Sequence, residues 1–245
     1  MSLRALSYVI RQLTRMPHVT VSVGDDPASL EFYTFATNRH RRYFFIRNKS
    51  WGVAMLKLPD TFEEYLRGAG KTFLRHQQRL ALSAGYYFDS ITAVDHLDEI
   101  LSIHSSRPVR QGQPISPAYL DRSELSKYFS GAAVVFAVRD RSGIVRAYAH
   151  TLMLGEVAIF DRLMGHGEHL KNGIMYLLVS EAVRAICERK AGFNSPQWVM
   201  YDMMLGAGEG LRFFKERLGF QPYYVSWRRP PSRCADCMRV DGEGH

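Results

Sequence analysis

Apolar residues from position 132 onward fall into short runs that tight turns separate. The three runs are AAVVFAV (132–138), IVRAYAHTLML (144–154) and VAIFDRLMG (157–165). RDRSG (139–143) and Gly155-Glu156 lie between them. Short turns between β-rich runs predict an antiparallel meander of three strands.

The apolar positions then change to a helical period. Over residues 172–190 they recur three and four residues apart, at Ile174, Leu177, Leu178, Ala182, Val183 and Ile186, which predicts a helix. QWVMYDMML (197–205) predicts a buried strand, GEGLRFFKERLG (208–219) a second helix and FQPYYVSW (220–227) a final strand. The order β-β-β-α-β-α-β predicts an α/β (α+β) fold with a mixed, mostly antiparallel sheet flanked by helices.

The first half of the chain has a weaker pattern. VTVSV (19–23), LEFYTFA (30–36), YFFIR (43–47) and GVAMLKL (52–58) predict strands, and residues 6–13 predict an amphipathic helix. Thr61 to Glu64 resembles a capping box. Further helices are predicted for KTFLRHQQRLALSAG (71–85) and LDEILSIHSS (97–106), and a Pro-Gly-rich loop follows at 107–117.

The composition indicates a folded and basic protein. Of its 245 residues 46% are hydrophobic, and the net charge is +8 with a pI near 9.5. This charge favours an anionic partner: nucleic acid, an acidic carrier protein or a phosphorylated small molecule. No apolar run reaches the length of a membrane span, and residues 1–18 lack the apolar core of a signal peptide. We therefore expect a cytoplasmic protein without a membrane span.

The three cysteines indicate neither a disulfide framework nor a complete metal site. Cys187 falls in the helix predicted for residues 172–190 and is expected in the core. Cys234 and Cys237 form a CxxC, which is half of a zinc site, and His245 is the only further ligand nearby. We expect residues 229–245 to form a mobile tail and expect no metal; zinc binding by the CxxC is the alternative.

Basic residues recur on one face of the helix predicted for residues 71–85. Lys71, Arg75 and Arg79 are spaced i, i+4 and i+8. This stripe is either a solvated helix face or a track for the phosphates of an anionic ligand.

The segment GHGEHLKNG (165–173) places glycines between a predicted strand and a predicted helix. Glycines before a helix N-terminus suit a phosphate or a carbonyl oxygen. His166 or His169 is a candidate base for an incoming amine. The alternative is a long surface connection.

Two aspartates interrupt apolar strands. Asp161 lies in VAIFDRLM and Asp202 in WVMYDMML. A carboxylate in a buried strand needs a partner or a role. Each is either part of a local ion pair, as for Asp161 beside Arg162, or a group that binds an acceptor amine or accepts its proton. His150, in RAYAHTLM, is either a core histidine or a member of the same site.

Lys215 stands beside two aromatic residues in RFFKERLGF (212–220). In this position its charge either reaches water along the helix face or meets a negative group.

Two stretches and the element order resemble a known superfamily. The order β-β-β-α-β-α-β and the ending ERLGF (216–220) resemble the GNAT (general N-acetyltransferase) superfamily. KTFLRHQQRLALSAGY and the Phe214-Lys215 pair resemble its Fem-type branch, whose members transfer an amino acid from aminoacyl-tRNA to an amine. The resemblance covers about residues 60 to 227.

The resemblance implies roles for these residues. Lys215 would stabilise the negative charge that develops when an amine attacks an ester or thioester carbonyl. Asp161, Asp202 or His166 would accept a proton. The residues expected to bind the donor are Gly165, Gly167, His169, Asn172, Gly173, Phe214, Lys71, Arg75 and Arg79. Because Fem enzymes carry two GNAT-like halves, we expect an acyltransferase domain at 61–228 and a reduced partner half at 1–60.

We therefore expect an acyltransferase that forms an amide directly, without a covalent enzyme intermediate. The acceptor would be a small-molecule or peptide amine, and the donor an aminoacyl-tRNA that serves as co-substrate, with no tightly bound cofactor. An N-acyltransferase that uses acyl-CoA or an acyl carrier protein is the first alternative. A non-catalytic GNAT-fold module that binds RNA or protein is the second.

Overall fold

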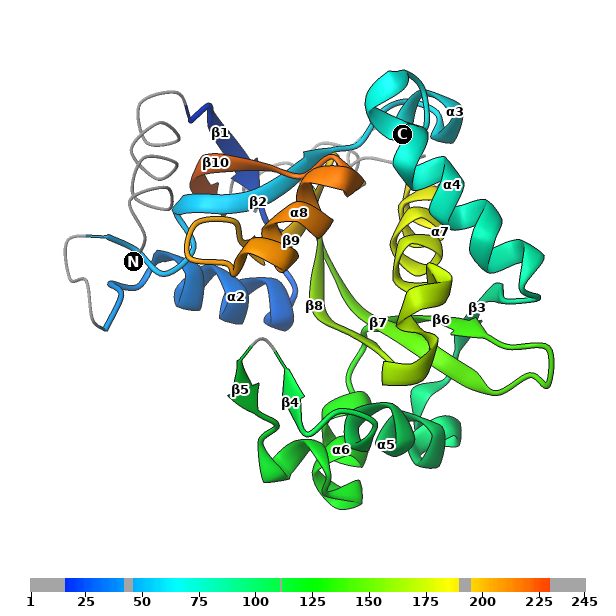
Figure 1. The fold of residues 1–245 in the computed structure, drawn as a ribbon. Coiled ribbons are helices and arrows are strands. Elements are labelled where there is room, and N and C mark those ends of the chain that lie inside the picture. Colours follow the sequence, from blue (N-terminus) through cyan, green and yellow to red (C-terminus); the bar gives the residue numbers. More distant parts are fainter. Residues whose placement is uncertain (1–15, 42–45, 111, 190–194, 230–245) are drawn as a thin grey trace, which may run out of the picture.

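A single large β-sheet organises the protein (Figure 1). The computed structural model describes residues 16–41, 46–110, 112–189 and 195–229. The sheet has eight strands in the order β1-β10-β2-β9-β8-β7-β6-β3. In chain order these are β1 (His18–Ser22), β2 (Trp51–Lys57), β3 (Tyr87–Ile91), β6 (Val134–Arg139), β7 (Val145–Leu154), β8 (Val157–Gly165), β9 (Trp198–Met203) and β10 (Gln221–Arg228).

The pairing within the sheet is mostly antiparallel. The two parallel pairs are β1 with β10 and β8 with β9. The mixed, mostly antiparallel sheet predicted from the sequence is therefore confirmed, as is the order β6-β7-β8-α7-β9-α8-β10. A separate hairpin joins β4 (Val109–Arg110) to β5 (Gln113–Pro114) within the predicted 107–117 loop.

Helices cover both faces of the sheet. The α-helices are α2 (Pro27–Thr37), α3 (Phe62–Tyr65), α4 (Thr72–Ser83), α5 (Leu97–Ser105), α6 (Arg122–Phe129), α7 (Ile174–Glu188) and α8 (Glu209–Leu218). The short 3-10 helices are η1 (Ala69–Lys71), η2 (Ala93–His96), η3 (Pro117–Tyr119) and η4 (Gly167–Asn172).

Alternation along the strands divides the core between the two faces. Ala158 and Phe160 of β8 pack in one cluster with α4, α7 and α8. Val157 and Ile159 point the other way and join the cluster beneath α2. Helices α5 and α6 cover the rest of that second face. Side chains of successive strand residues therefore reach opposite layers.

One predicted strand is wrong. LEFYTFA (30–36) lies in helix α2. The helix starts here because Asp26 accepts a hydrogen bond from the backbone N–H of Ser29 at 3.0 Å and Pro27 occupies its first turn. The aromatic content of the segment suggested a strand, but this N-terminal cap favours the helix. Most of the strand predicted at 43–47, the helix predicted at 6–13 and the tail beyond residue 229 lie outside the described residues.

The sheet crosses the boundary that the sequence suggested at residue 60. β2 lies between β9 and β10, antiparallel to both, and its five inner residues are buried. The segment before residue 60 thus contributes a central strand to the same sheet as the strands after it.

Strands β8 and β9 are paired over only part of their length. Their parallel pairing joins residues 157–159 of β8 to residues 198–200 of β9. Both strands continue beyond this point, each with a different partner on its other side. An unpaired gap between two neighbouring strands therefore opens in the middle of the sheet.

A bulge follows the last pair on each of these strands. In β7, His150 and Thr151 pair with Arg162 and Phe160 of β8, which leaves Asp161 as the extra residue. In β9, an extra residue falls just after Met200, opposite β2. Because a bulge bends its strand and interrupts pairing, the two bulges account for the separation of β8 from β9.

Replacement of Gly173 tests how closely α4 packs on the start of α7. Gly173 has φ of 76°, and a Cβ there would lie 2.5 Å from the carbonyl oxygen of Gln77. We expect Gly173→Ala to lower the free energy of unfolding by about 2 kcal/mol, because an L-residue is strained at this φ and the α4 backbone has to move. Denaturant unfolding measures the change.

Gly210→Ala on α8 is the matched control. Nothing lies within 4 Å of a Cβ at this position. The control variant is expected to keep the wild-type stability or gain less than about 1 kcal/mol. Equal stabilities of the two variants would contradict the close packing at Gly173.

Candidate functional site

Lys215 is buried on α8 beside the end of β9. Its side chain is 1% exposed, and Nζ donates a hydrogen bond to the carbonyl oxygen of Met203 at 2.8 Å. Nζ also lies 4.4 Å from the ring centroid of Tyr201. Burial lowers the pKa of Lys215 to about 8; the charge of Asp202 opposes this shift and that of Lys49 adds to it. The lysine therefore does not extend along the helix face into water.

The position of this ammonium group suits it to stabilise an anion. An ammonium has three hydrogens to donate, and within the described residues Nζ makes the single hydrogen bond to Met203. A charge held in a poorly solvated environment acts on a neighbouring charge more strongly than one in water. Lys215 thus places a cation at the end of the strand that separates from β8.

Phe214 connects α8 to the strands and to α7. Its ring centroid lies 4.8 Å from that of Tyr176 on α7 and 6.4 Å from that of Tyr201 on β9. Tyr201 in turn lies 6.3 Å from Phe160 on β8. These rings form a continuous aromatic layer across the gap between β8 and β9, and they hold α8 and its lysine in place.

Asp202 occupies the bulged end of β9. It has φ of 49°, the one positive φ of a non-glycine residue in the described chain. Its side chain is 61% exposed and forms an ion pair with Lys49. The structure therefore gives this carboxylate a partner in the segment before β2, the strand that pairs with β9 on the side away from β8.

Asp161, the bulged residue of β8, belongs to a polar cluster on the other face of the sheet. Its carboxylate accepts a hydrogen bond from the hydroxyl of Tyr128 on α6 and lies 3.4 Å from Nδ1 of His150. Nδ1 of His150 also lies 3.0 Å from the Tyr128 hydroxyl. The hydrogen bond from His150 and that from Tyr128 lower the pKa of Asp161, as does the charge of Arg162, although burial opposes them. Asp161 is therefore a carboxylate at neutral pH.

Arg162 joins this cluster to the segment before α6. Its guanidinium lies 3.7 Å from the ring centroid of Tyr128 and 4.1 Å from that of Tyr119, so it is stacked between two tyrosines. His150 is 5% exposed. It is thus a buried histidine, as the simpler interpretation of its sequence position held, and it contacts the carboxylate of Asp161.

Residues 165–173, expected to form a glycine-rich loop, contain the 3-10 helix η4. The backbone N–H of Gly167 donates to Oγ of Ser106 at 2.9 Å. The hydroxyl of Tyr86 binds Nδ1 of His169 at 2.6 Å and accepts from Nδ2 of Asn172 at 2.9 Å. Helix α7 follows, with Gly173 at its N-cap position and therefore without a side-chain cap. Its first N–H groups thus have no side-chain acceptor, an arrangement that suits an anion.

The two histidines of this segment are neutral near pH 7. Burial lowers the pKa of His166 and of His169, and the charge of Arg146 adds to both shifts. A neutral imidazole has a lone pair to accept a proton or bind a metal.

Lys71, Arg75 and Arg79, the basic stripe of α4 and the residue before it, make different contacts. Lys71 donates to the carbonyl oxygen of Leu218, at the end of α8, at 2.6 Å, and burial lowers its pKa to about 8. Arg75 donates to carbonyl oxygens of Leu66 and Gly68 just after α3. Arg79 is exposed. Two of the three cations therefore stabilise the ends of helices, and binding of a phosphate by the stripe stays a prediction.

The expected site residues fall on two sides of the sheet. Lys215, Phe214 and the start of α7 lie on the face covered by α4, α7 and α8. Asp161 contacts α6 on the opposite face. The gap between β8 and β9 lies between these two groups, so the lysine and the aspartate border it from opposite layers.

Three residues that contact the expected site residues were not predicted from the sequence: Tyr128, Tyr86 and Lys49. Tyr128 lies on α6, whose start carries a detectable signal: Asp121 accepts hydrogen bonds from the N–H groups of Ser123 and Glu124, in the pattern D-x-x-E. Tyr86 and Lys49 carry no such signal, because each acquires its role from a partner more than eighty residues away.

Comparison with known proteins gives similarity in structure alone. Neither a protein-family model nor a curated protein sequence matches this chain. The structure resembles FemX with a TM-score of 0.55 at 11% identity, over 70% of this chain and 59% of FemX. It resembles a conserved protein of unknown function from Bacteroides thetaiotaomicron with a TM-score of 0.53 at 15% identity, over 69% and 56% of the two chains.

A third similar structure is L-PGS from Bacillus licheniformis, with a TM-score of 0.51 at 17% identity. The match covers 70% of this chain and 58% of L-PGS. This chain thus spans less than two thirds of the length of each of the three proteins.

These similarities, together with the strand order and the separation of β8 from β9, establish the fold. The protein has the GNAT fold that its sequence resembles. Among the helices of the described residues, none is both long enough and apolar enough to cross a membrane.

Replacement of Lys215 by methionine tests whether the buried charge of Lys215 lowers the stability of the folded protein. Folding lowers the pKa of Lys215 from 10.5 to about 8, so the charged form opposes folding below pH 8. This effect fades as the pH rises from 8 toward 10.5, because the proton is then already lost in the folded state. We expect Lys215→Met to be more stable than wild type at pH 7 by about 1 kcal/mol or more, with a smaller difference at pH 10.

Denaturant unfolding of both proteins at the two pH values measures this. A variant less stable than wild type at pH 7 would contradict the expectation. It would mean that the hydrogen bond to Met203 outweighs the desolvation of the charge, and that Lys215 serves the fold.

Proposed function

We propose that the protein is an acyltransferase that forms an amide by moving an activated aminoacyl or acyl group directly to an amine. The observation that carries this proposal is the buried ammonium of Lys215 at the end of β9, where β9 and β8 are no longer paired. A fold stabilised by hydrophobic burial gains little from a buried lysine, so a role in chemistry accounts for its presence.

The chemistry follows from the charges around the gap. The acceptor nitrogen attacks the donor carbonyl carbon, a C–N bond forms, and the carbonyl oxygen becomes negative. Lys215 stabilises this oxyanion. Electrostatic stabilisation of this kind is usually the largest single contribution to the rate enhancement of acyl transfer. The bond to the leaving oxygen or sulfur then breaks, and the nitrogen loses its proton.

Asp161 is the candidate group for binding the acceptor amine. It is a carboxylate at neutral pH, and Tyr128 and His150 hold it in place. A carboxylate attracts an ammonium and orients it before the proton is lost. Asp202 carries the same charge but is paired with Lys49, and His166 is a neutral imidazole. Asp202 and His166 are the alternatives to Asp161 as the group that accepts the proton from the amine.

The proposed donor is an aminoacyl-tRNA. Support comes from the excess of basic residues, from the Fem-like stretches around Lys71 and Phe214, and from the structural similarity to FemX. The uncapped start of α7 also suits the pyrophosphate of coenzyme A. This observation favours a thioester donor as the second candidate.

A two-donor assay distinguishes the candidates. The protein is incubated with a mixture of amines and either charged tRNA or acyl-CoA. Transfer that RNase abolishes supports the tRNA donor, whereas release of free thiol supports the thioester donor. If neither donor is consumed or bound, the non-catalytic module becomes the better explanation.

Removal of the Lys215 charge is expected to abolish most of the activity. Lys215→Ala and Lys215→Met should each lower turnover by about a hundredfold or more, because the oxyanion loses its cation. Initial rates at saturating donor measure the effect, with Lys57→Met at the exposed end of β2 as the control. Near-normal turnover of a folded Lys215 variant would refute the proposed role.

A further inference from the structure

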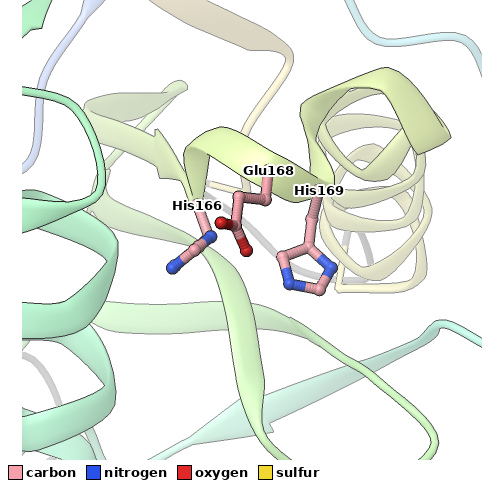
Figure 2. A group of neighbouring side chains, drawn as sticks. All are labelled: His166, Glu168 and His169. Carbon is pink, nitrogen blue, oxygen red and sulfur yellow. The ribbon is translucent and has the colours of Figure 1, made fainter.

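We propose that His166, Glu168 and His169 form a binding site for a divalent transition-metal ion of the zinc class. Figure 2 shows the three side chains extending from the same side of η4, with the carboxylate of Glu168 between the two imidazoles. One ligand atom from each residue lies within 4.8 Å of the other two. Two imidazoles and a carboxylate are a ligand set that zinc uses in proteins.

The local backbone brings the three ligands together. His166 precedes the first residue of η4, and the carbonyl oxygen of His166 accepts a hydrogen bond from the N–H of His169 at 3.1 Å. A 3-10 helix places residues i and i+3 on the same side. The two histidines therefore lie on one side of the turn, with their ring centroids 5.1 Å apart.

A hydrogen bond outside the cluster is compatible with the metal-binding form of His169. The hydroxyl of Tyr86 lies 2.6 Å from Nδ1 of His169 and accepts from Nδ2 of Asn172. A tyrosine oxygen can accept two hydrogen bonds, so Nδ1–H of His169 can donate to it as well. The proton is then on Nδ1, and the lone pair of Nε2 is available to the metal. Such second partners orient most metal-binding histidines.

The environment of His166 is a second, independent observation that supports a metal ion at this position. Its Nδ1 is buried and has no hydrogen-bond partner in the described structure. A buried polar atom without a partner is uncommon and unfavourable. A bound metal ion would satisfy either this nitrogen or, by rotation of the ring, its neighbour.

Two of the basic residues nearby, Arg146 and Arg110, have partners outside the cluster. Arg146 is paired with Asp140 at 2.6 Å. Arg110 donates to the carbonyl oxygens of Ile103 and Gly165. Glu168 is exposed and carries a charge that favours a cation. Glu168 therefore supplies the negative ligand of the cluster, and Arg107, whose side chain lies against Gly167, is the cation that an incoming metal ion has to displace.

Three protein ligands leave at least one coordination position of a tetrahedral ion open for water or another ligand. Metal binding would also occupy His166, so Asp161 and Asp202 would then be the proton acceptors of the proposed transfer. The metal site itself does not depend on that transfer, since it is tested by binding and not by turnover.

Cobalt titration followed by absorption spectroscopy tests the site. The 245-residue protein carries Cys234→Ser and Cys237→Ser, so that the CxxC near residue 235 cannot bind the probe. We expect one equivalent of Co²⁺ to bind with visible absorption bands, and Zn²⁺ to displace it. His166→Ala and His169→Ala should each weaken Zn²⁺ binding at least about tenfold, and Tyr86→Phe should also weaken it by about tenfold.

His76→Ala, an exposed histidine of α4, is the control and should leave Zn²⁺ affinity unchanged. Circular dichroism checks that each variant is folded. The proposal is overturned if Zn²⁺ at about 100 µM does not bind, or if affinity is the same after His166 and His169 are both replaced.

Discussion

The separation of β8 from β9 is the constraint on which the rest of this structure depends. Two neighbouring parallel strands exchange hydrogen bonds over only three residues each, and then each bends away at its own bulge. Backbone groups in the middle of a sheet are normally paired, so an opening there calls for compensation. At the end of β9 the ammonium of Lys215 donates to the carbonyl oxygen of Met203. The rings of Phe160, Tyr201 and Phe214 pack against one another beside the gap.

The two aspartates that interrupt the apolar strands mark this separation. Asp161 is the extra residue of β8, and Asp202 lies at the bulged end of β9 with a positive φ. Each has a polar partner: Asp161 contacts Tyr128 and His150, and Asp202 pairs with Lys49. The buried cation of Lys215 lies on the opposite face. This division gives the gap a positive group on one side and a negative group on the other, which suits the reaction of an amine with a carbonyl.

The sequence predicted the part of the fold that local patterns determine. The meander, α7, β9, α8 and β10 follow from periodicity and turn residues, and the structure confirms them. Helix α2 was missed because its aromatic composition resembled a strand, while the cap at Asp26 decided the outcome. The insertion of β2 between β9 and β10 is a long-range pairing that no local pattern encodes. Long-range contacts limited the prediction of the site in the same way. Lys215 and the two aspartates could be recognised as charged residues in apolar segments. Lys49, Tyr86 and Tyr128 could not, because they belong to the site only through contacts with residues distant in the sequence.

The pH dependence of a single turnover tests the central claim most directly, because it reports the charge of Lys215 during the chemical step. With burial lowering the pKa of this residue to about 8, the transfer rate of the wild-type protein should fall as the pH rises through 8 and the cation is lost. Lys215→Met should transfer slowly at every pH and lack this decline. A decline of the same size in both proteins would show that another group is responsible, and would contradict the assignment of Lys215 as the stabilising cation.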